Sequence, residues 1–297
     1  MNRPMLAAAY NGEILNFPLL ATPKVDGVRA LVINGNLVSR SFKSIPNVAI
    51  RSLLEHLLPE GADGELSVNF DFQETISVVM SVHAGVPENL RFYWFDWVQN
   101  SNLDVPYERR VSSTEKYAMV HEDDHNSSFV IPLIPRQIHN LEELASYEAF
   151  VLGQGFEGVV LRVPGGKYKC GRSTMKEALM IKVKRYEDYE ATVVGTEELM
   201  HNLNEKQKDN FGKTKRSSTK QGKLKSGTLG AIVAITDEGY VFKIGTGYTS
   251  KQRSEFWTMR DELIGKLVKY RHATLGKSHS GVPKSTVFLG IRHKDDT

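Results

Sequence analysis

The segment "TPKVDGVRA", residues 22–30, places Lys24 two positions before the pair Asp26-Gly27 and Arg29 two positions after it. A lysine amine can attack phosphorus as a nucleophile once it has lost its proton. The ordinary pKa of a lysine is about 10.4, so such a nucleophile needs nearby cations or burial. Asp-Gly is also a strong signal for a hairpin turn, in which the lysine would be a solvated turn residue. The segment alone leaves both interpretations open.

Further clusters could complete a phosphoryl-transfer site around this lysine. They lie in "SRSFK", "ADGE", "FYWFDW", "FEGVV" and "IKVK", and their candidates are Arg40, Lys43, Glu65, Phe95, Glu157, Lys182 and Lys184. Basic residues and a metal stabilise the charge that spreads over phosphate oxygens in the transition state. Carboxylates can hold the metal or ribose hydroxyls, and an aromatic ring can stack on a purine. Taken singly, each cluster is equally typical of a strand edge or a core, and the two strand lysines favour an exposed face.

Composition limits the class of protein. The chain has 297 residues, 40% of them hydrophobic, which suits one large or two ordinary domains. A single cysteine, Cys170, excludes a disulfide framework and a cysteine zinc site within one chain. No apolar run approaches the ~18 residues of a membrane span, and the first residues do not resemble a signal peptide. We therefore expect a soluble, intracellular protein.

Charge is unevenly distributed along the chain. The net charge is +3, but the segment His201–Lys225 has eight Lys or Arg and two acids, hence +6, which leaves −3 for the rest. Such a polar, basic run cannot bury itself and could be a disordered loop. It could equally be an arm that orders on a phosphate backbone.

Periodicity and turn residues predict an α+β protein. In the first part we expect a hairpin at 26–42, helices at 46–58, 72–83, 106–120 and 141–155, and strands at 62–68, 89–98, 157–163 and 178–185. After residue 185 short strands with glycine turns surround one helix near 251–265, a pattern typical of an oligonucleotide-binding (OB) barrel. We therefore predict domains at 1–187 and 188–297, with the basic arm, about 201–230, inserted after the first strand of the second.

The ordered motifs "KVDGVR", "SRSFK", "DGE", "FYWFD", "EGVVLR" and "IKVK" resemble those of covalent nucleotidyltransferases: DNA ligases, RNA ligases and mRNA capping enzymes. The chain is most similar to ATP-dependent DNA ligases, above all the minimal viral ones. That likeness runs nearly end to end and includes "GKYKCGRSTMKE", "FKIGTG" and the tail "VFLGIRHKDD". It implies a nucleotidyltransferase (adenylation) domain followed by an OB-fold domain with a basic latch.

The resemblance also implies an activity and its residues. The protein would use ATP and Mg²⁺ or Mn²⁺ to seal nicks in duplex DNA, as a monomer, through a lysyl-AMP intermediate on Lys24. Thr22 would lie near the adenine and Phe95 would stack on it, while Arg29 and Glu65 would contact the ribose. The other implied roles are metal or acid–base groups at Glu65 and Glu157, AMP phosphate contacts at Lys182 and Lys184, nick contacts at Arg40, Lys43 and Arg172, latch contacts with DNA at Lys213, Lys215 and Arg216, and pyrophosphate orientation by Arg292 and Asp296.

Two questions stay open at this point. The last motif of cellular ligases is Arg-x-Asp-Lys, whereas this chain has "RHKDD", so Asp295 is an alternative to Asp296. The nucleophile, turn and barrel would also suit an RNA ligase or a GTP-dependent mRNA capping guanylyltransferase. A non-catalytic nucleic-acid-binding module would share the barrel and the basic arm.

Overall fold

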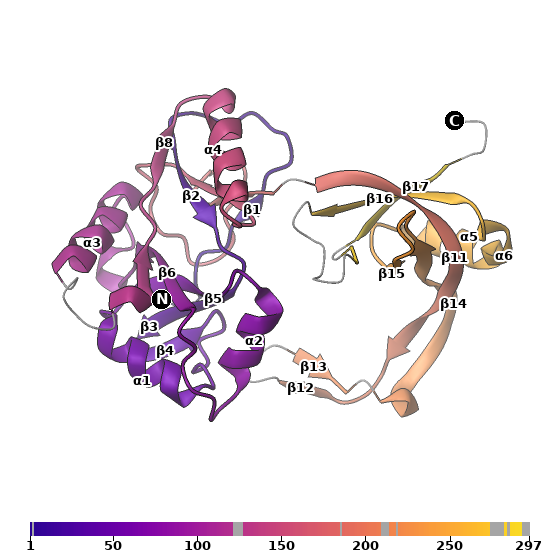
Figure 1. Ribbon diagram of the computed structural model, residues 1–297, viewed down its shortest axis with the longest axis horizontal. Coiled ribbons are helices and arrows are strands. Elements are labelled where there is room, and N and C mark those ends of the chain that lie inside the picture. The colour runs from indigo at the N-terminus through magenta and orange to yellow at the C-terminus, as the bar shows by residue number, and fades with distance from the viewer. Residues whose placement is uncertain are drawn as a thin grey trace. The chain divides into compact units, whose positions relative to one another are not determined.

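The computed structural model describes residues 1, 3–120, 127–184, 186–208, 214–217, 219–273, 282–283 and 286–292. The chain divides into two compact units (Figure 1). The first contains Met1–Lys184, and the second contains Arg185–Gln207 and Thr214–Thr297. None of the described helices is long and apolar enough to cross a membrane.

The first unit is built on two five-stranded sheets, here named sheet I and sheet II. Sheet I has the order β1 (Ala8–Ala9), β10 (Ile181–Val183), β9 (Gly158–Arg162), β2 (Leu19–Lys24) and β8 (Arg136–Ile138). Sheet II has the order β4 (Asn36–Ser39), β3 (Val28–Ile33), β5 (Ala62–Val68), β6 (Leu90–Trp97) and β7 (Val130–Pro132). The sequence predicted β3, β4, β5, β6, β9 and β10, whereas β2 and the short strands β1, β7 and β8 were not predicted.

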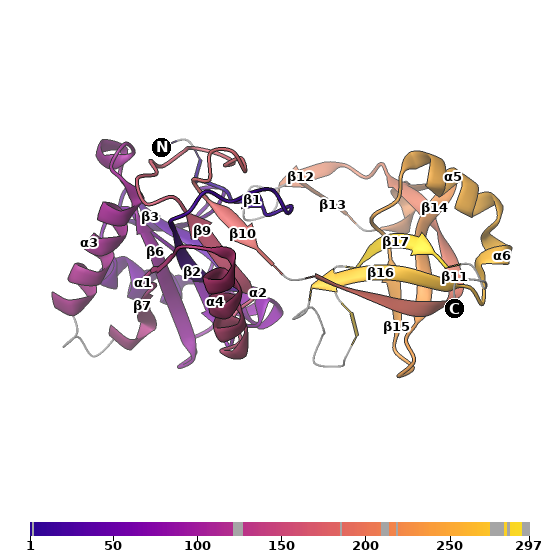
Figure 2. The ribbon, with the colours of Figure 1, turned by 90° about the horizontal axis from the view of Figure 1, so that it is seen from above.

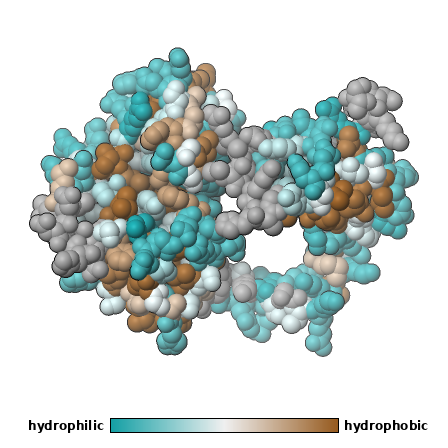
Figure 3. Space-filling model, viewed as in Figure 1, coloured by the Kyte–Doolittle hydropathy of each residue, from teal (hydrophilic) through white to brown (hydrophobic). Residues whose placement is uncertain are grey.

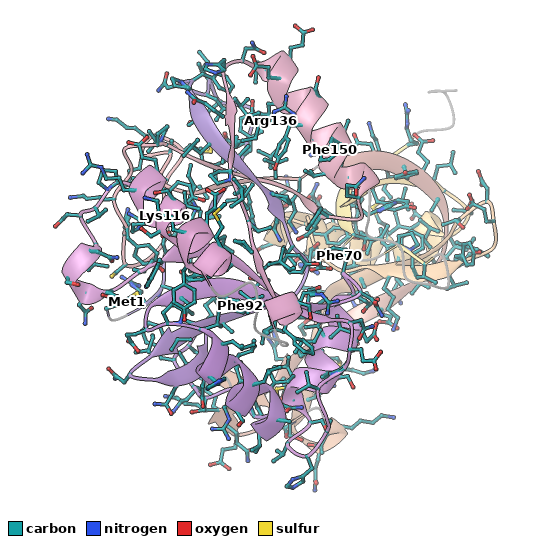
Figure 4. All side chains as sticks on the ribbon, turned by 60° about the vertical axis from the view of Figure 1, so that its left-hand side comes forward. Met1, Phe70, Phe92, Lys116, Arg136 and Phe150 are labelled. Atoms are coloured by element: carbon teal, nitrogen blue, oxygen red, sulfur yellow. The ribbon has the colours of Figure 1, made fainter. Side chains whose placement is uncertain are left out.

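Four helices cover these sheets: α1 (Val48–Leu57), α2 (Phe72–Met80), α3 (Tyr107–Val120) and α4 (Leu141–Gly153). Helices α1 and α2 begin where the side chains of Asn47 and Asp71 accept backbone N–H groups of the first turn. Their apolar faces join the core of sheet II, in which Phe92 is fully buried (Figure 4). Helix α4 packs on sheet I through Leu144 and Val151, whereas its Phe150 is exposed. The predicted helices are therefore present, with ends that differ by a few residues.

The Asp-Gly pair of the opening segment is not a hairpin turn. Strand β2 ends at Lys24 in sheet I and β3 begins at Val28 in sheet II, so the intervening residues cross from one sheet to the other. Gly27 is required there because a Cβ atom would lie 2.0 Å from the carbonyl oxygen of Leu66. The solvated-turn interpretation of the lysine is therefore wrong. The predicted hairpin is present one strand later, where Asn34 and Gly35 have φ of 51° and 71° between β3 and β4.

Buried ion pairs join the two sheets. Asp96 on β6 of sheet II accepts hydrogen bonds from Arg162 on β9 of sheet I and from Arg110 on α3, the latter at 2.8 Å to Nε. All three side chains are at most 1% exposed. Burial acts to raise the pKa of Asp96, but the two guanidinium groups outweigh it and hold that pKa below the ordinary value. Asp96 is therefore an anion between two cations, on which the spacing of the sheets depends.

The second unit has the strand order of an OB fold. Its sheet has the order β15 (Val241–Ile244), β14 (Lys223–Ile235), β11 (Tyr186–Asn202), β16 (Leu267–Ala273) and β17 (Val287–Ile291). An isolated bridge pairs Thr246, two residues after β15, with Val287 at the start of β17. Helices α5 (Ser250–Thr258) and α6 (Arg260–Leu263) follow β15 and precede β16 along the chain. Figure 2 shows both helices at one side of this unit. These features match the predicted five strands and intervening helix.

The basic arm contains regular structure at its base. Strands β11 and β14 continue their pairing into it, with Met200 opposite Lys225 and Asn202 opposite Lys223. Beyond them lie β12 (Lys206–Lys208), β13 (Thr214–Arg216), which pair with each other, and the 3₁₀ turn η3 (Lys220–Gly222). Two further 3₁₀ turns, η1 (Asn100–Asn102) and η2 (Ser127–Phe129), belong to the first unit. The described part of the arm is mainly hydrophilic on its surface (Figure 3).

We expect Asp96→Asn to lower the free energy of unfolding of the first unit by about 3 kcal/mol, because it leaves two buried guanidinium groups without a carboxylate. Urea unfolding followed by tryptophan fluorescence, to which Trp94 and Trp97 contribute, measures this. The matched control is Asp104→Asn, whose carboxylate is 91% exposed and 3.6 Å from Lys167, and should change stability by at most about 0.5 kcal/mol. Equal effects of the two substitutions would contradict this account of the sheet junction.

Candidate active site

An open cavity in the first unit is lined by residues of both sheets. Sheet I contributes Thr22, Lys24 and Lys182, and sheet II contributes Arg29, Glu65 and Phe95. Arg40 and Arg172 also line it. Eight of the residues predicted from the sequence thus surround one cavity. Its other lining residues are Leu6, Ala7, Pro23, Val25, Val160, Arg162 and Met180.

The amine of Lys24 is held by a carboxylate of the neighbouring strand. The antiparallel pairing of β2 and β9 sets Lys24 opposite Gly158, and the N–H of Glu157 donates to the carbonyl of Lys24 at 2.8 Å. One carboxylate oxygen of Glu157 accepts from Lys24 Nζ and the other accepts from Lys184 Nζ. These three side chains are 15–21% exposed, so the group is partly shielded from water. Lys24 lines the cavity, whereas Glu157 and Lys184 are not among its lining residues.

Lys182 on β10 and Lys184, which follows this strand, both have a lowered pKa. Burial, followed by the positive charge of Lys24, lowers the pKa of Lys184 to about 8 although Lys184 is paired with Glu157. Burial is also the main cause that lowers the pKa of Lys182, and Lys24 and Arg172 act in the same direction. Both lysines therefore lie in a site with an excess of positive charge, which favours phosphate.

Glu65 has the opposite shift. Burial raises the pKa of Glu65 to about 7, and the carboxylates of Asp63 and Asp26 raise it further, while Lys24 and Arg29 act to lower it. A carboxylate that titrates near neutral pH in a cavity is typical of a functional group. Glu65 and Lys24 line the same cavity.

Two guanidinium groups lie close to the ring of Phe95. Arg29 is 4.9 Å and Arg162 is 5.5 Å from its centroid. The ring is only 9% exposed but lines the cavity, so one part of it is available for stacking. Figure 4 shows the dense packing of side chains in this unit around the labelled Phe70 and Phe92.

Arg29 has firm protein partners in addition to its place in the cavity wall. It donates to Asp63 through Nε at 2.7 Å and through Nη2, and it donates to the carbonyl of Met5 at 2.9 Å. Tyr168 donates to the same carboxylate at 3.0 Å and accepts from the N–H of Met5. The predicted ribose contact of Arg29 would therefore have to be made by a side chain that Asp63 already orients.

The predicted nick-binding residues divide into two groups. Arg172 donates to the carbonyl of Ala7 at 2.6 Å, and Arg40 lies in the wall of both this cavity and an adjoining one lined by Ser41 and Phe72. Lys43 follows Phe42, a residue with φ of 59°, and is in neither wall. The structure therefore brings Arg40 and Arg172, but not Lys43, to the described cavities.

Sequence reasoning missed four polar residues that build the site: Asp63, Asp96, Arg162 and Tyr168. All four lie in motifs that were already quoted: Asp63 in "ADGE", Asp96 in "FYWFDW", Arg162 in "EGVVLR" and Tyr168 in "GKYKCGRSTMKE". Period-2 alternation along β9 could have indicated that Arg162 lies on the same strand face as Val160, a cavity residue. No local pattern reveals that Tyr168 reaches the N–H of Met5.

Of the two C-terminal residues predicted to orient pyrophosphate, only Arg292 lies within the described residues. Its Nε donates to Glu190 on β11 at 2.6 Å, at an exposed position of the second unit. Asp296 and its alternative Asp295 lie outside the described residues, as do Lys213 and the side chain of Lys215. Arg216 is described and donates to the carbonyl of Asn204.

The chain is similar to one family model and to several solved structures. A family model described as a DNA ligase OB-like domain matches residues 221–292. The crystal structure of a chlorella virus DNA ligase-adenylate is 39% identical to this chain, covers 98% of it and 99% of its own chain, and superposes with a TM-score of 0.57. The chain belongs to the family of ATP-dependent DNA ligases.

More distant ligases share the fold. A structure from a study of Lig E DNA ligases, described as a minimal scaffold, has 23% identity and a TM-score of 0.74, and covers 98% of this ligase and 100% of its own chain. The ATP-dependent DNA ligase of bacteriophage T7 in complex with ATP has 15% identity and a TM-score of 0.53, with 98% and 99% coverage. No curated protein matches the ligase in sequence. The predicted fold class, an α+β nucleotidyltransferase unit followed by an OB-fold unit, is confirmed. Of the alternative functions, the comparisons support a DNA ligase.

We expect Glu65→Gln to stabilise the ligand-free ligase at high pH. The folded protein retains the Glu65 proton up to about pH 7, whereas the ordinary value of 4.5 applies to the unfolded chain. The folded pKa is raised, so the contribution of this carboxyl to stability is complete below pH 4.5 and is lost as the pH rises through 7. Urea unfolding should therefore show a larger advantage of the variant at pH 8 than at pH 5.

The control for this measurement is Glu142→Gln, which removes an exposed carboxylate at the start of α4. A stability difference between Glu65→Gln and wild type that is equal at both pH values would show that Glu65 is not titrating in the folded protein near neutrality.

Proposed function

We propose that Lys24 is the residue that carries AMP in this DNA ligase, and that the cavity around it binds ATP. The observation that supports this most directly is the position of the Lys24 amine, on the edge of the cavity and in contact with Glu157. In the first step the amine nitrogen attacks the α-phosphorus of ATP. A P–N bond forms, the bond to the bridging oxygen breaks, and pyrophosphate leaves.

Glu157 is the candidate base for this step. It already accepts a hydrogen bond from Lys24, and a general base must lie within such reach of the proton that it removes. Its second oxygen accepts from Lys184, so the carboxylate remains oriented toward both amines. Lys182 and Lys184 would then stabilise the charge on the α-phosphate, since both are close enough to Lys24 to interact with its charge.

The adenosine would occupy the inner part of the cavity. Phe95 offers an aromatic surface in contact with two guanidinium groups, and Thr22 is 3% exposed in the same wall. Glu65 and Arg29 line the part of the cavity that would receive the ribose. A rigid wall of this kind favours binding, because few side chains have to be ordered when the nucleotide enters.

A divalent cation fits the residues that are present. Mg²⁺ is commonly held by one or two carboxylates together with substrate phosphates and waters, and the described residues contain no cluster of three or more metal-binding side chains. Glu65 and Glu157 would provide the carboxylates, and the cation would neutralise phosphate charge when bound. Manganese would suit the same oxygen ligands.

In the later steps the enzyme would act on nicked duplex DNA. A 5′-phosphate oxygen at the nick attacks the AMP phosphorus, the P–N bond breaks and Lys24 recovers its proton. The 3′-hydroxyl then attacks the 5′-phosphorus, the strand is joined and AMP leaves. Arg40 and Arg172 are the candidates for holding the nick phosphate, with Lys43 at the periphery. We assign nucleotidyl transfer to residues 1–187. DNA clamping, by a monomer, is assigned to residues 188–297, where phosphate contacts of the arm would come from Lys213, Lys215 and Arg216. In the same part of the chain, Arg292 and Asp296 would orient pyrophosphate.

With ATP and Mg²⁺, we expect the wild type to join a single 5′-phosphorylated nick in duplex DNA, and Lys24→Ala to give no joined strand on a denaturing gel. The matched control is Lys116→Ala, which removes a lysine of α3 outside the cavity and should leave sealing intact (Figure 4). Replacing ATP by GTP should abolish joining, because capping guanylyltransferases rather than DNA ligases use GTP. Sealing by Lys24→Ala would refute the assignment of the nucleophile, and an adenylated wild type that seals only RNA would refute the substrate.

A further inference from the structure

The hydroxyl of Tyr168 lies at a buried junction of hydrogen bonds in the first unit. It donates to the carboxylate of Asp63 at 3.0 Å and accepts from the N–H of Met5 at 2.9 Å. A carboxylate can only accept and a backbone N–H can only donate, so the direction of both hydrogen bonds is determined. Tyr168 is 4% exposed, and burial, followed by the charge of Asp63, raises its pKa well above the ordinary value of 10. The hydroxyl therefore keeps its proton for Asp63 at neutral and mildly alkaline pH.

Arg29 closes this junction into a ring of four residues. Its Nε donates to Asp63 at 2.7 Å, and its Nη1 donates to the carbonyl of Met5 at 2.9 Å. Asp63 is fully buried and accepts from both Arg29 and Tyr168, while the two backbone groups of Met5 are bound by the same two side chains. Each member of the ring thus has two other members as partners, and none can shift without breaking a hydrogen bond. Arg29 is the member of this ring that lines the cavity.

The two residues that follow Met5 form part of the cavity wall. Leu6 and Ala7 both line the cavity. The N–H of Met5 is bound by the hydroxyl of Tyr168, and the N–H of Leu6 donates to the carbonyl of Gly171 at 2.8 Å. Tyr168 and Gly171 are three positions apart in the chain, so one short segment supports two successive residues of the wall strand. The position of this wall therefore depends on the same hydroxyl as the position of the guanidinium group.

We propose that Tyr168 is a positioning residue for ATP, whose hydroxyl fixes Arg29 and the wall at residues 6–7 in the arrangement that receives the nucleotide. This inference rests on the proposed binding of ATP in the cavity. Tyr168 is not among the residues that line the cavity, so it acts through the ring. Without the hydroxyl, Asp63 and the N–H of Met5 each lose a buried partner, which loosens both the guanidinium group and the wall. A site that is already ordered binds more tightly, because less freedom is lost when the ligand enters.

The alternative role for this hydroxyl is to stabilise the fold alone, since a buried phenol usually has a hydrogen-bond partner. The two roles differ in their effect on the reaction. A purely structural role predicts a lower thermal unfolding midpoint and an unchanged dependence of the reaction on ATP concentration in the folded protein. A positioning role predicts weaker binding of ATP by protein that is fully folded.

The test is formation of lysyl-AMP by the whole chain with Mg²⁺ and ATP labelled at the α-phosphorus, without DNA, over a range of ATP concentrations. Tyr168→Phe keeps the ring and removes only the hydroxyl. We expect the ATP concentration that gives the half-maximal rate to rise about tenfold, since two buried hydrogen bonds are lost. The rate at saturating ATP should stay within about twofold of the wild-type rate, because Lys24 and Glu157 are unchanged and the lost interaction acts on binding.

Asp63→Asn is a second variant of the same ring. It should raise the half-maximal ATP concentration by a similar factor. The double variant should be close to the more impaired single variant, because the effects of residues in one hydrogen-bond network are not additive. Circular dichroism and thermal unfolding show whether each variant is folded, so that a poorly folded Tyr168→Phe would leave Asp63→Asn to decide the question.

Two other tyrosines provide matched controls. Tyr147→Phe alters a phenol that is 6% exposed in the core of sheet I. Tyr248→Phe removes a hydroxyl that donates to the carbonyl of Ile244 at 2.9 Å in the second unit. Neither tyrosine is among the residues that line the cavity, so both variants should keep the ATP dependence of the wild type even where their stability falls.

An unchanged ATP dependence in folded Tyr168→Phe would overturn the inference. So would additive effects of Tyr168→Phe and Asp63→Asn, or a rate at saturating ATP that falls by a larger factor than the half-maximal concentration rises. A wild type that forms no lysyl-AMP from ATP would instead refute the proposed function, and with it this inference. That outcome is distinct from an active wild type whose ATP dependence Tyr168→Phe shares.

Discussion

The passage of the chain from one sheet to the other between Lys24 and Val28 is the constraint on which the active site depends. Sheet I supplies the amine, its carboxylate partner and the strand lysines, whereas sheet II supplies the aromatic wall and Glu65. A nucleotide has its base at one end and its phosphates at the other. In this site sheet II lines the end that suits the base, and sheet I lines the end that suits the phosphates. The short crossover fixes their separation, and it is possible only because Gly27 lets the backbone pass against the carbonyl of Leu66.

Buried charge holds the two sheets at that separation. The ion pair of Arg162 with Asp96 spans them, and Arg162 also lies 4.4 Å from the ring of Tyr107 and 5.5 Å from that of Phe95. Replacing such a network by apolar residues is often neutral or stabilising in proteins, so stability alone does not explain it. Its directional hydrogen bonds instead fix the orientation of Phe95, which apolar packing alone would specify less sharply. Burial of Glu65, which raises its pKa to about 7, lowers the stability of the folded protein at neutral pH. Residues that serve function often reduce stability in this way.

Much of the fold follows from local sequence pattern. The strand at 89–98 is rich in aromatic residues, and the helix after Pro46 has a polar residue, Asn47, at its cap. The short strands β1 and β8 could not be predicted, because two or three residues have no periodicity and become strands only by pairing with β10 and β2. The hydrogen bonds between the two limbs of the basic arm could not be predicted either. The side-chain amide of Asn204 donates to carbonyl groups 13 and 15 residues further along a polar segment, and no local pattern indicates such contacts.

The site was predicted as a set of residues but not as a set of contacts. The order of motifs was enough to name Lys24 and Glu157, which are 133 residues apart in the chain, yet only the pairing of β2 with β9 shows that they touch. The sequence predicted that Arg29 contacts the ribose, but it did not predict the hydrogen bond from Arg29 to Asp63. A motif does not indicate which strand will pair with the strand that contains it. Arg292 is similar, since its pairing with Glu190 depends on the register of the OB-fold strands.

The central claim is that AMP is bound to Lys24, and the most direct measurement is to locate the modified residue. The wild-type protein is incubated with ATP and Mg²⁺, digested at neutral or alkaline pH, at which a phosphoramidate survives, and sequenced by tandem mass spectrometry. The account predicts AMP on the peptide that contains Lys24, with Lys182 and Lys184 unmodified. AMP found on Lys184, whose amine shares the carboxylate of Glu157 and has a pKa of about 8, would contradict it.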